Sequence, residues 1–196
     1  MKKVYILFLL SVIVYVGAQA QSIEKGYHGF VEGGYSINTG ATLGLDWPEI
    51  NTIHGYQATP SFFIGAGVGF HSMPEKEEGF IGNGTPMWKR ESSMEIPLFA
   101  DFRWTMFNKR TTPLLDLRLG HCLTNGGGTY GSLGAGCRIS LKNQKAIYIL
   151  AAFTIHEIQF QEAYMVTTKY SYYWYYRDQN YKEEQRAISL KVGFEF

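Results

Sequence analysis

The residues best suited to catalysis are a histidine and a glutamate that stand side by side, His156 and Glu157. A serine hydrolase needs a nucleophile within hydrogen-bond reach of a histidine that a carboxylate orients. A His-x-Ser spacing would supply the first two groups, but Ile158 stands where the serine would be. We therefore expect a protein that is not an enzyme, in which His156 is a polar residue near one rim of the fold.

Metal and disulfide chemistry depend on the histidines and cysteines. No two of the five histidines have ligand spacing on one strand, so the sequence predicts no metal site and no cofactor; they are His28, His54, His71, His121 and His156. Cys122 and Cys137 could pair in an oxidising compartment. Alternation instead puts them on opposite faces of neighbouring strands, which favours two independent small apolar side chains.

Charged residues recur at alternate positions within apolar segments. Four acids are balanced by four bases; the set is Glu32, Asp101, Arg103, Asp116, Arg118, Arg138, Lys191 and Glu195. Such a set is either a polar conduction path or a packed ion network. The elements that carry it decide between the two.

Eight segments carry apolar residues at every second position, the period of a β-strand with one apolar face. In the clearest segment, alternate residues from Ile96 to Met106 form the apolar face, and the opposite face includes Asp101 and Arg103. Capped helical segments are absent from the sequence. We predict an all-β protein with strands at residues 27–37, 51–59, 61–70, 95–106, 113–120, 130–141, 146–158 and 187–196.

The first 20 residues have the pattern of a signal peptide. A basic start at Lys2 and Lys3 precedes an apolar run, and Ala18-Gln19-Ala20 supplies the small residues that a signal peptidase cuts after. We expect residues 1–20 to be removed and residues 21–196 to form one domain. Losing the two lysines changes the formal charge from +1 to −1, which gives no reason to expect nucleic acid as a partner.

The expected connections alternate in length. Those near Pro60, at 108–111 and at 142–145 are short, while 38–50, 71–93 and 159–185 are long. A Gly-rich stretch at 121–129 is intermediate. Short turns at one end and long loops at the other are typical of bacterial outer-membrane barrels. The sequence thus predicts an eight-stranded antiparallel up-and-down transmembrane β-barrel.

A secreted lipocalin-like barrel also alternates, with its apolar face inward. Two features favour the membrane. The polar face is largely Gly, Ser and Thr with few charges. Aromatic residues also stand near strand ends, as an interfacial girdle requires, namely Tyr27, Tyr35, Phe62, Phe70, Trp104, Phe194 and Phe196.

The signal peptide, the eight strands and the terminal aromatic Phe196 resemble the small outer-membrane β-barrel family that includes OmpA-like transmembrane domains and OmpX. The segment MEIPLFADFRW (94–104) resembles a strand common in barrel-domain proteins of Bacteroides-like bacteria. The resemblance implies a monomer in the outer membrane of a Gram-negative bacterium. It also implies that Phe194 and Phe196 belong to the signal read by the barrel assembly machinery.

An eight-stranded barrel has an interior just wide enough for side chains to fill. Phe63, Phe99, Leu114 and Tyr148 share the inward face and narrow it further. We therefore expect a packed lumen and a structural or surface-interaction role. The alternatives are a narrow porin-like channel, a lipid-modifying outer-membrane enzyme such as some members of the family are, and a secreted lipocalin-like binding barrel.

The most unusual segment is YSYYWYYRDQNY (170–181), whose aromatic residues are Tyr170, Tyr172, Tyr173, Trp174, Tyr175 and Tyr176. One interpretation is an exposed loop that binds a surface glycan or a host protein. The other is that the last two strands extend past the membrane, with aromatics pairing across them. The second is slightly favoured, and both can hold.

A short turn fixes one register. If residues 108–111 form a four-residue turn, opposed residues have numbers that sum to 219. That register puts Asp101 opposite Arg118 and Arg103 opposite Asp116. We predict that these four side chains form an inward charge lattice.

Overall fold

The structure is a computed structural model, and it describes residues 23–41, 44–79, 86–167 and 172–196. No helix long and apolar enough to cross a membrane occurs among these residues. They form eleven β-strands: β1 (Gly26–Asn38), β2 (Trp47–Thr59), β3 (Phe62–Met73), β4 (Lys76–Gly79), β5 (Pro86–Arg90), β6 (Ser93–Glu95), β7 (Pro97–Thr105), β8 (Thr111–Cys122), β9 (Gly128–Ser140), β10 (Ala146–Thr167) and β11 (Tyr172–Glu195).

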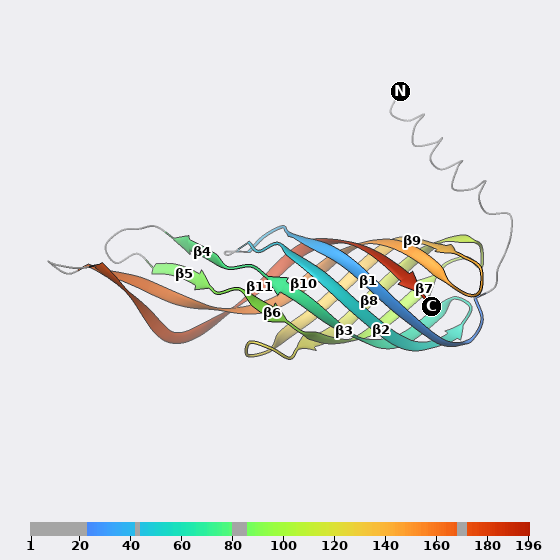
Figure 1. Cartoon of the computed structure of the whole chain (residues 1–196), viewed down its shortest axis with the longest axis horizontal. Helices are drawn as coiled ribbons and strands as arrows, with labels where there is room; N and C mark the ends of the chain where they lie inside the picture. Colours follow the sequence, from blue (N-terminus) through green and yellow to red (C-terminus); the bar gives the residue numbers. More distant parts are fainter. Residues whose placement is uncertain (1–22, 42–43, 80–85, 168–171) are drawn as a thin grey trace, which may run out of the picture.

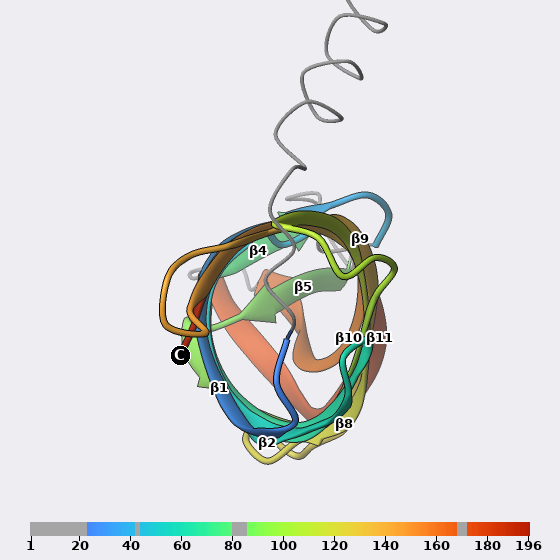
Figure 2. The same ribbon diagram turned by 90° about the vertical axis from the view of Figure 1, so that its right-hand side faces the viewer.

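Eight of these strands close into an antiparallel barrel, in the order β1-β2-β3-β7-β8-β9-β10-β11 (Figures 1 and 2). The last strand closes it, because β11 pairs with both β10 and β1. The β11–β1 ladder runs from Glu195 opposite Phe30 to Ala187 opposite Asn38. The predicted eight-stranded antiparallel barrel is confirmed.

Period-two alternation gives the barrel an apolar exterior and a buried interior. On β11, Ile188, Leu190 and Val192 are exposed, while Ser189 and Lys191 between them are buried. On the other barrel strands, too, exposed residues alternate with buried ones. On β11 the apolar exterior begins at Ile188, since the preceding outward residues are Arg186 and Glu184.

Two strands continue far beyond the barrel. β10 and β11 have 22 and 24 residues and stay paired up to Thr167 opposite Tyr172, with one irregularity between Gln161 and Ala163. β5 pairs with β10 along this extension, and β4 pairs with β5 (Figure 1). Within the expected long loops at 71–93 and 159–185, the residues that the structure describes are therefore mostly in strands. Interstrand backbone hydrogen bonds satisfy these polar stretches without burial in the barrel.

The chain terminus is anchored at the opposite end (Figure 1). Phe196 donates its amide hydrogen to the Gly29 carbonyl at 2.9 Å and accepts one from Gly29 at 3.0 Å. Its ring lies over Gly29, where an added Cβ would come within 2.6 Å of the ring. A residue at the chain end is usually frayed, whereas this one completes the ladder that closes the barrel.

Candidate functional site

The centre of the lumen holds a square of two aspartates and two arginines from β7 and β8. The register places Asp101 opposite Arg118 and Arg103 opposite Asp116, as the 219 sum predicts. Arg103 Nε lies 3.0 Å from Asp101 Oδ1 and 3.2 Å from Asp116 Oδ2, and Arg118 Nε lies 3.3 Å from Asp101 Oδ2 and 2.9 Å from Asp116 Oδ1. All four side chains are buried, so each side of the square is an ion pair shielded from water.

Glu32 of β1 joins the square from across the lumen. It accepts hydrogen bonds from both terminal nitrogens of Arg118, at 2.9 Å for Nη2, and from the Tyr148 hydroxyl at 2.7 Å. Asn51 Nδ2 donates to Glu32 Oε1 at 3.0 Å, whereas Tyr148 donates to Oε2. Arg103 lies over the ring of Phe30, with Cζ 4.1 Å from the centroid. The square is thus tied to three further strands.

A second branch of this charge network runs toward the end of the barrel from which β10 and β11 extend, the hairpin end. Lys191 Nζ lies 3.1 Å from Glu49 Oε1 and 4.0 Å from Glu32 Oε1, and Glu49 Oε2 lies 3.1 Å from His71 Nε2. Sequence reasoning missed Glu49, because it began the second strand at residue 51. The parity of Asn51 and Ile53, extended back to Trp47, would have put Glu49 inside.

The remaining predicted charges form a separate group near the opposite end of the barrel, where Phe196 lies and which we call the terminus end. Arg138 Nε lies 2.6 Å from Glu195 Oε2, and His28 Nδ1 lies 2.9 Å from Glu195 Oε1. All eight predicted lumenal charges are buried, but they divide into this group and the central square with its branch.

Apolar side chains fill the lumen between the charged groups. Phe30, Phe63, Phe99 and Tyr148 belong to one buried cluster. Next to it, between Phe63, Arg103 and Tyr148, a cavity of about 10 Å³ remains. That volume is at the lower limit for a single water molecule. The interior at this level is packed with side chains.

A third group, which sequence reasoning did not find, lies at the hairpin end of the lumen. Glu95, Cys122 and His156 come from β6, β8 and β10, are all buried, and have one ligand-type atom each within 4.8 Å of the others. His156 faces Gln185 across the β10–β11 ladder, between the outward Glu184 and Arg186. The prediction of a polar histidine near the rim located it correctly along the strand, but its side chain is fully buried.

Hydrogen bonds hold the carboxylate of this third group. Arg90 Nη2 lies 2.5 Å from Glu95 Oε1, and Asn125 Nδ2 donates to the same oxygen at 2.9 Å. The Cys122 thiol donates to Glu95 Oε2 at 2.9 Å. Burial alone would raise the pKa of Glu95, but bonds from Cys122, Asn125 and Arg90 lower it.

Burial shifts the pKa values of the other two members of the third group toward their neutral forms. Burial, with the bond to Glu95, raises the pKa of the Cys122 thiol. Burial lowers the pKa of His156 to about 4, and neither of its ring nitrogens has a hydrogen-bond partner. Because its hydrogen bond goes to Glu95, the Cys122 thiol is paired with the carboxylate and not with the His156 imidazole. Cys137 points outward from β9, and neither cysteine forms a disulfide.

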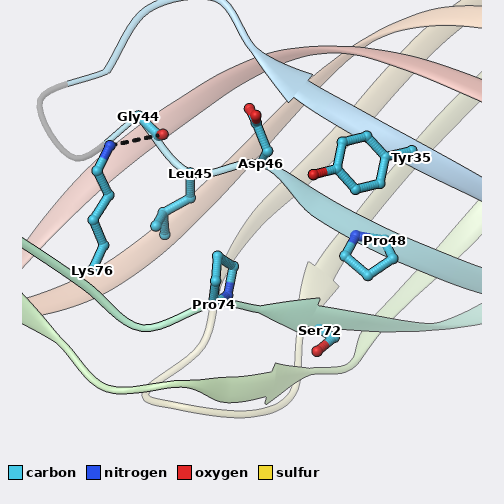
Figure 3. Close-up of a pocket in the computed structure, with 8 residues that line it drawn as sticks. All are labelled: Tyr35, Gly44, Leu45, Asp46, Pro48, Ser72, Pro74 and Lys76. Carbon is cyan, nitrogen blue, oxygen red and sulfur yellow. Dashed lines mark hydrogen bonds between the residues drawn. The ribbon is translucent and has the colours of Figure 1, made fainter.

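An open groove of about 400 Å³ lies outside the barrel wall near the same end (Figure 3). Tyr35, Leu45, Pro48 and Pro74 supply much of its lining. Its charged groups are already engaged with the backbone: Lys76 Nζ donates to the Gly44 carbonyl at 3.0 Å, and Asp46 accepts from the Asn38 amide at 2.7 Å. The groove carries no unengaged charge for a ligand among these lining residues.

The aromatic segment is only partly described. Tyr170 lies outside the described residues. Tyr172, Tyr173, Trp174, Tyr175 and Tyr176 are on β11, and their backbones pair with β10 between Thr167 and Ala163. The strand-extension interpretation is confirmed for the backbone of these five residues. At the other end, Phe194 and Phe196 are exterior residues of β11 with ring centroids 6.4 Å apart.

These features define the class: a closed eight-stranded antiparallel β-barrel with an apolar exterior and a charged, packed interior. No family model matches the sequence, and a search of curated proteins finds no match. Among solved structures, the chain is similar to the β domain of the Bordetella autotransporter BrkA, at 10% identity and a TM-score of 0.27. That similarity covers 87% of this chain and 99% of the other. A similarity this weak leaves function to be argued from the site.

Proposed function

We propose that the protein is an outer-membrane β-barrel of a Gram-negative bacterium, with a structural or surface-interaction role and without catalysis. The observation that carries the proposal is the direction of its side chains. Large apolar residues point outward, and the carboxylates and guanidinium groups of the lattice point inward. A soluble lipocalin-like barrel has the reverse arrangement, whereas a barrel in lipid requires this one.

Exterior aromatics support the membrane assignment. At the terminus end, Tyr27 faces Tyr56 and Phe62 faces Trp104 across their ladders, and all four rings are exposed. Rings of this kind suit the two membrane interfaces. The short turns at this end then face the periplasm, and the β10–β11 hairpin projects from the cell.

The projecting sheet supports a surface role. A spanning strand needs about 9–11 residues, and β10 and β11 have 22 and 24. Among the described residues, no further strand pairs with β4 or with β11 between Tyr172 and Arg186. Open sheet edges bind extended peptides by β-augmentation. Of the two partners expected from the sequence, a surface glycan or a host protein, the open edges support the host protein.

The packed lumen opposes the porin alternative, since the square and the phenylalanines fill the interior beside a cavity of about 10 Å³. The enzyme alternative needs a nucleophile paired with a base. The Cys122 thiol donates to the Glu95 carboxylate, but burial and this bond raise the pKa of the thiol and so favour its weakly nucleophilic form, and the ring nitrogens of His156 have no hydrogen-bond partner. Both observations support a non-catalytic barrel that does not conduct.

Two measurements test the proposal. The protein should fractionate with outer membranes and migrate differently on gels before and after boiling; recovery of a soluble periplasmic protein would overturn the membrane assignment. For the surface role, residues 162–179 are replaced by an Asn-Gly turn, because Gln161 faces Asn180. Intact cells are then tested on glycan arrays and immobilised host matrix proteins. Binding that needs the hairpin supports the surface role, and equal binding by both strains, or none, contradicts it.

A further inference from the structure

The group formed by Glu95, Cys122 and His156 has the donor atoms of a transition-metal site. A thiol sulfur, an imidazole nitrogen and a carboxylate oxygen lie within 4.8 Å of one another. In a tetrahedral zinc site, ligand atoms are about 3.3–3.8 Å apart. The most distant of the three atoms, at most 4.8 Å apart, would have to approach by roughly 1 Å, while the Cys122 sulfur and Glu95 Oε2, now 2.9 Å apart, would separate slightly.

The second observation is the state of His156. Its side chain is fully buried, and both ring nitrogens are without a hydrogen-bond partner. Buried polar groups almost always have partners, and each unpaired one has a free-energy cost. The ring of His71 lies 5.5 Å from that of His156, and its Nδ1 is also unpaired. His156 thus brings unsatisfied ring nitrogens to the thiol and the carboxylate.

The surroundings would orient the ligands. Arg90 and Asn125 donate to Glu95 Oε1, whereas Oε2 accepts from Thr124 and from the Cys122 thiol, so Oε2 is the oxygen beside the sulfur that would bind the ion. Outer hydrogen bonds of this kind fix the ligating carboxylates of metal sites. Zn²⁺ accepts the combination of sulfur, nitrogen and oxygen, while Mg²⁺ and Ca²⁺ prefer oxygen alone.

We propose that the barrel binds one Zn²⁺ ion, or a similar soft divalent ion, through Cys122, His156 and Glu95 at the hairpin end of the lumen. Three protein ligands leave a fourth position for water. Cys122 loses its thiol proton to the solvent when the ion binds, so the Zn²⁺–S bond replaces the S–H bond. The site lies outside the projecting sheet and does not depend on the surface role.

The route for the ion is the connection between β8 and β9. Thr124 and Asn125 both bond Glu95, and Asn125 and Gly126 are exposed to solvent. Asn125, Gly126 and Gly127 have positive φ angles of 51°, 84° and 69°. This tight turn separates the buried group from the outside by the thickness of one loop.

Co²⁺ is the probe, because a cobalt–thiolate bond gives a charge-transfer band in the near ultraviolet. The full-length protein is extracted in detergent and titrated with Co²⁺, then with Zn²⁺ as competitor. Cys137→Ser leaves Cys122 as the only cysteine and serves as the matched control. His121→Gln, at an exposed histidine next to Cys122 on β8, is the control for His156→Gln on β10. The gel shift on boiling confirms that each variant is folded.

We expect one Co²⁺ per chain, a thiolate band in the wild type and in Cys137→Ser, and displacement by Zn²⁺. His156→Gln should weaken binding by about 10- to 100-fold or more, and His121→Gln should leave it unchanged. The absence of a thiolate band from folded wild type would overturn the proposal. Loss of the band in Cys137→Ser, or unchanged affinity in His156→Gln, would also overturn it.

Discussion

Asp101 lies directly across the β7–β8 ladder from Arg118, with Arg118 Nε 3.3 Å from Asp101 Oδ2 inside the barrel. Both side chains are fully buried. The guanidinium also bonds Asp116 and Glu32, so it is shared by three carboxylates. Charges this well shielded stabilise the barrel only while they are balanced, because an uncompensated buried ion is costly.

Asp101→Ala or Arg118→Ala alone should therefore lower the free energy of unfolding by about 3–5 kcal/mol. The double variant keeps the lattice charge unchanged and should cost clearly less than the sum of the two. Urea unfolding in detergent measures all three. The partly exposed pair Glu157 and Lys182, with nitrogen and oxygen 3.1 Å apart, is the control and should couple by no more than about 1 kcal/mol. Strict additivity at Asp101 and Arg118 would contradict the lattice.

Gly193→Ala tests the packing of the lumen. An added Cβ would collide with the ring of Tyr148, whose hydroxyl donates to Glu32 at 2.7 Å. We expect a loss of about 1–3 kcal/mol in unfolding free energy, because the ring must leave its place beside the lattice. Gly33→Ala is the control, since the nearest atom there is the Glu49 carbonyl oxygen at 4.0 Å. Equal stability of the two variants would mean that the Tyr148 ring is loosely held.

The barrel and the lattice register follow from local rules. Period-two alternation fixes which residues of each strand point inward, and a short turn after Thr105 fixes the pairing of β7 with β8. Phe107 donates its amide hydrogen to the Thr112 hydroxyl at 3.0 Å across that turn. Two acid–base matches then favour this register over a shift by two residues.

The proposed metal site and the long β10–β11 hairpin could not be predicted from the sequence, because both depend on which strands become neighbours in the closed barrel. Glu95, Cys122 and His156 lie on strands that are far apart in the sequence. Glu95 also follows strands β4 and β5, which show no period-two alternation of apolar residues. Residues 182–184 are charged and look like a loop, but they are opposite residues 157–159 in a ladder. Outside the barrel, backbone pairing needs no apolar period, so alternation cannot reveal it.

Planar-bilayer recordings test whether the lumen conducts. We expect little or no conductance from the wild type, because the square, Phe63 and Phe99 fill the interior. Phe99→Ala removes a ring that lies 5.3 Å from the Arg118 guanidinium and should raise conductance only modestly, since the ion pairs remain. Steady, large single-channel steps from the wild type would make the porin-like channel the better proposal.

Deletion of Phe196 tests how the barrel closes. The deletion removes both backbone hydrogen bonds with Gly29 and the ring that covers it, and it takes away the terminal aromatic of the proposed assembly signal. We expect less heat-modifiable protein in the outer membrane, with unchanged export of the chain across the inner membrane. Trp104→Ala is the control, because it removes an exposed exterior aromatic at the same end but leaves the β11–β1 ladder intact. If the truncated chain inserts at the normal yield, closure depends on the rest of that ladder, from Glu195 to Ala187, and Phe196 is not part of the signal.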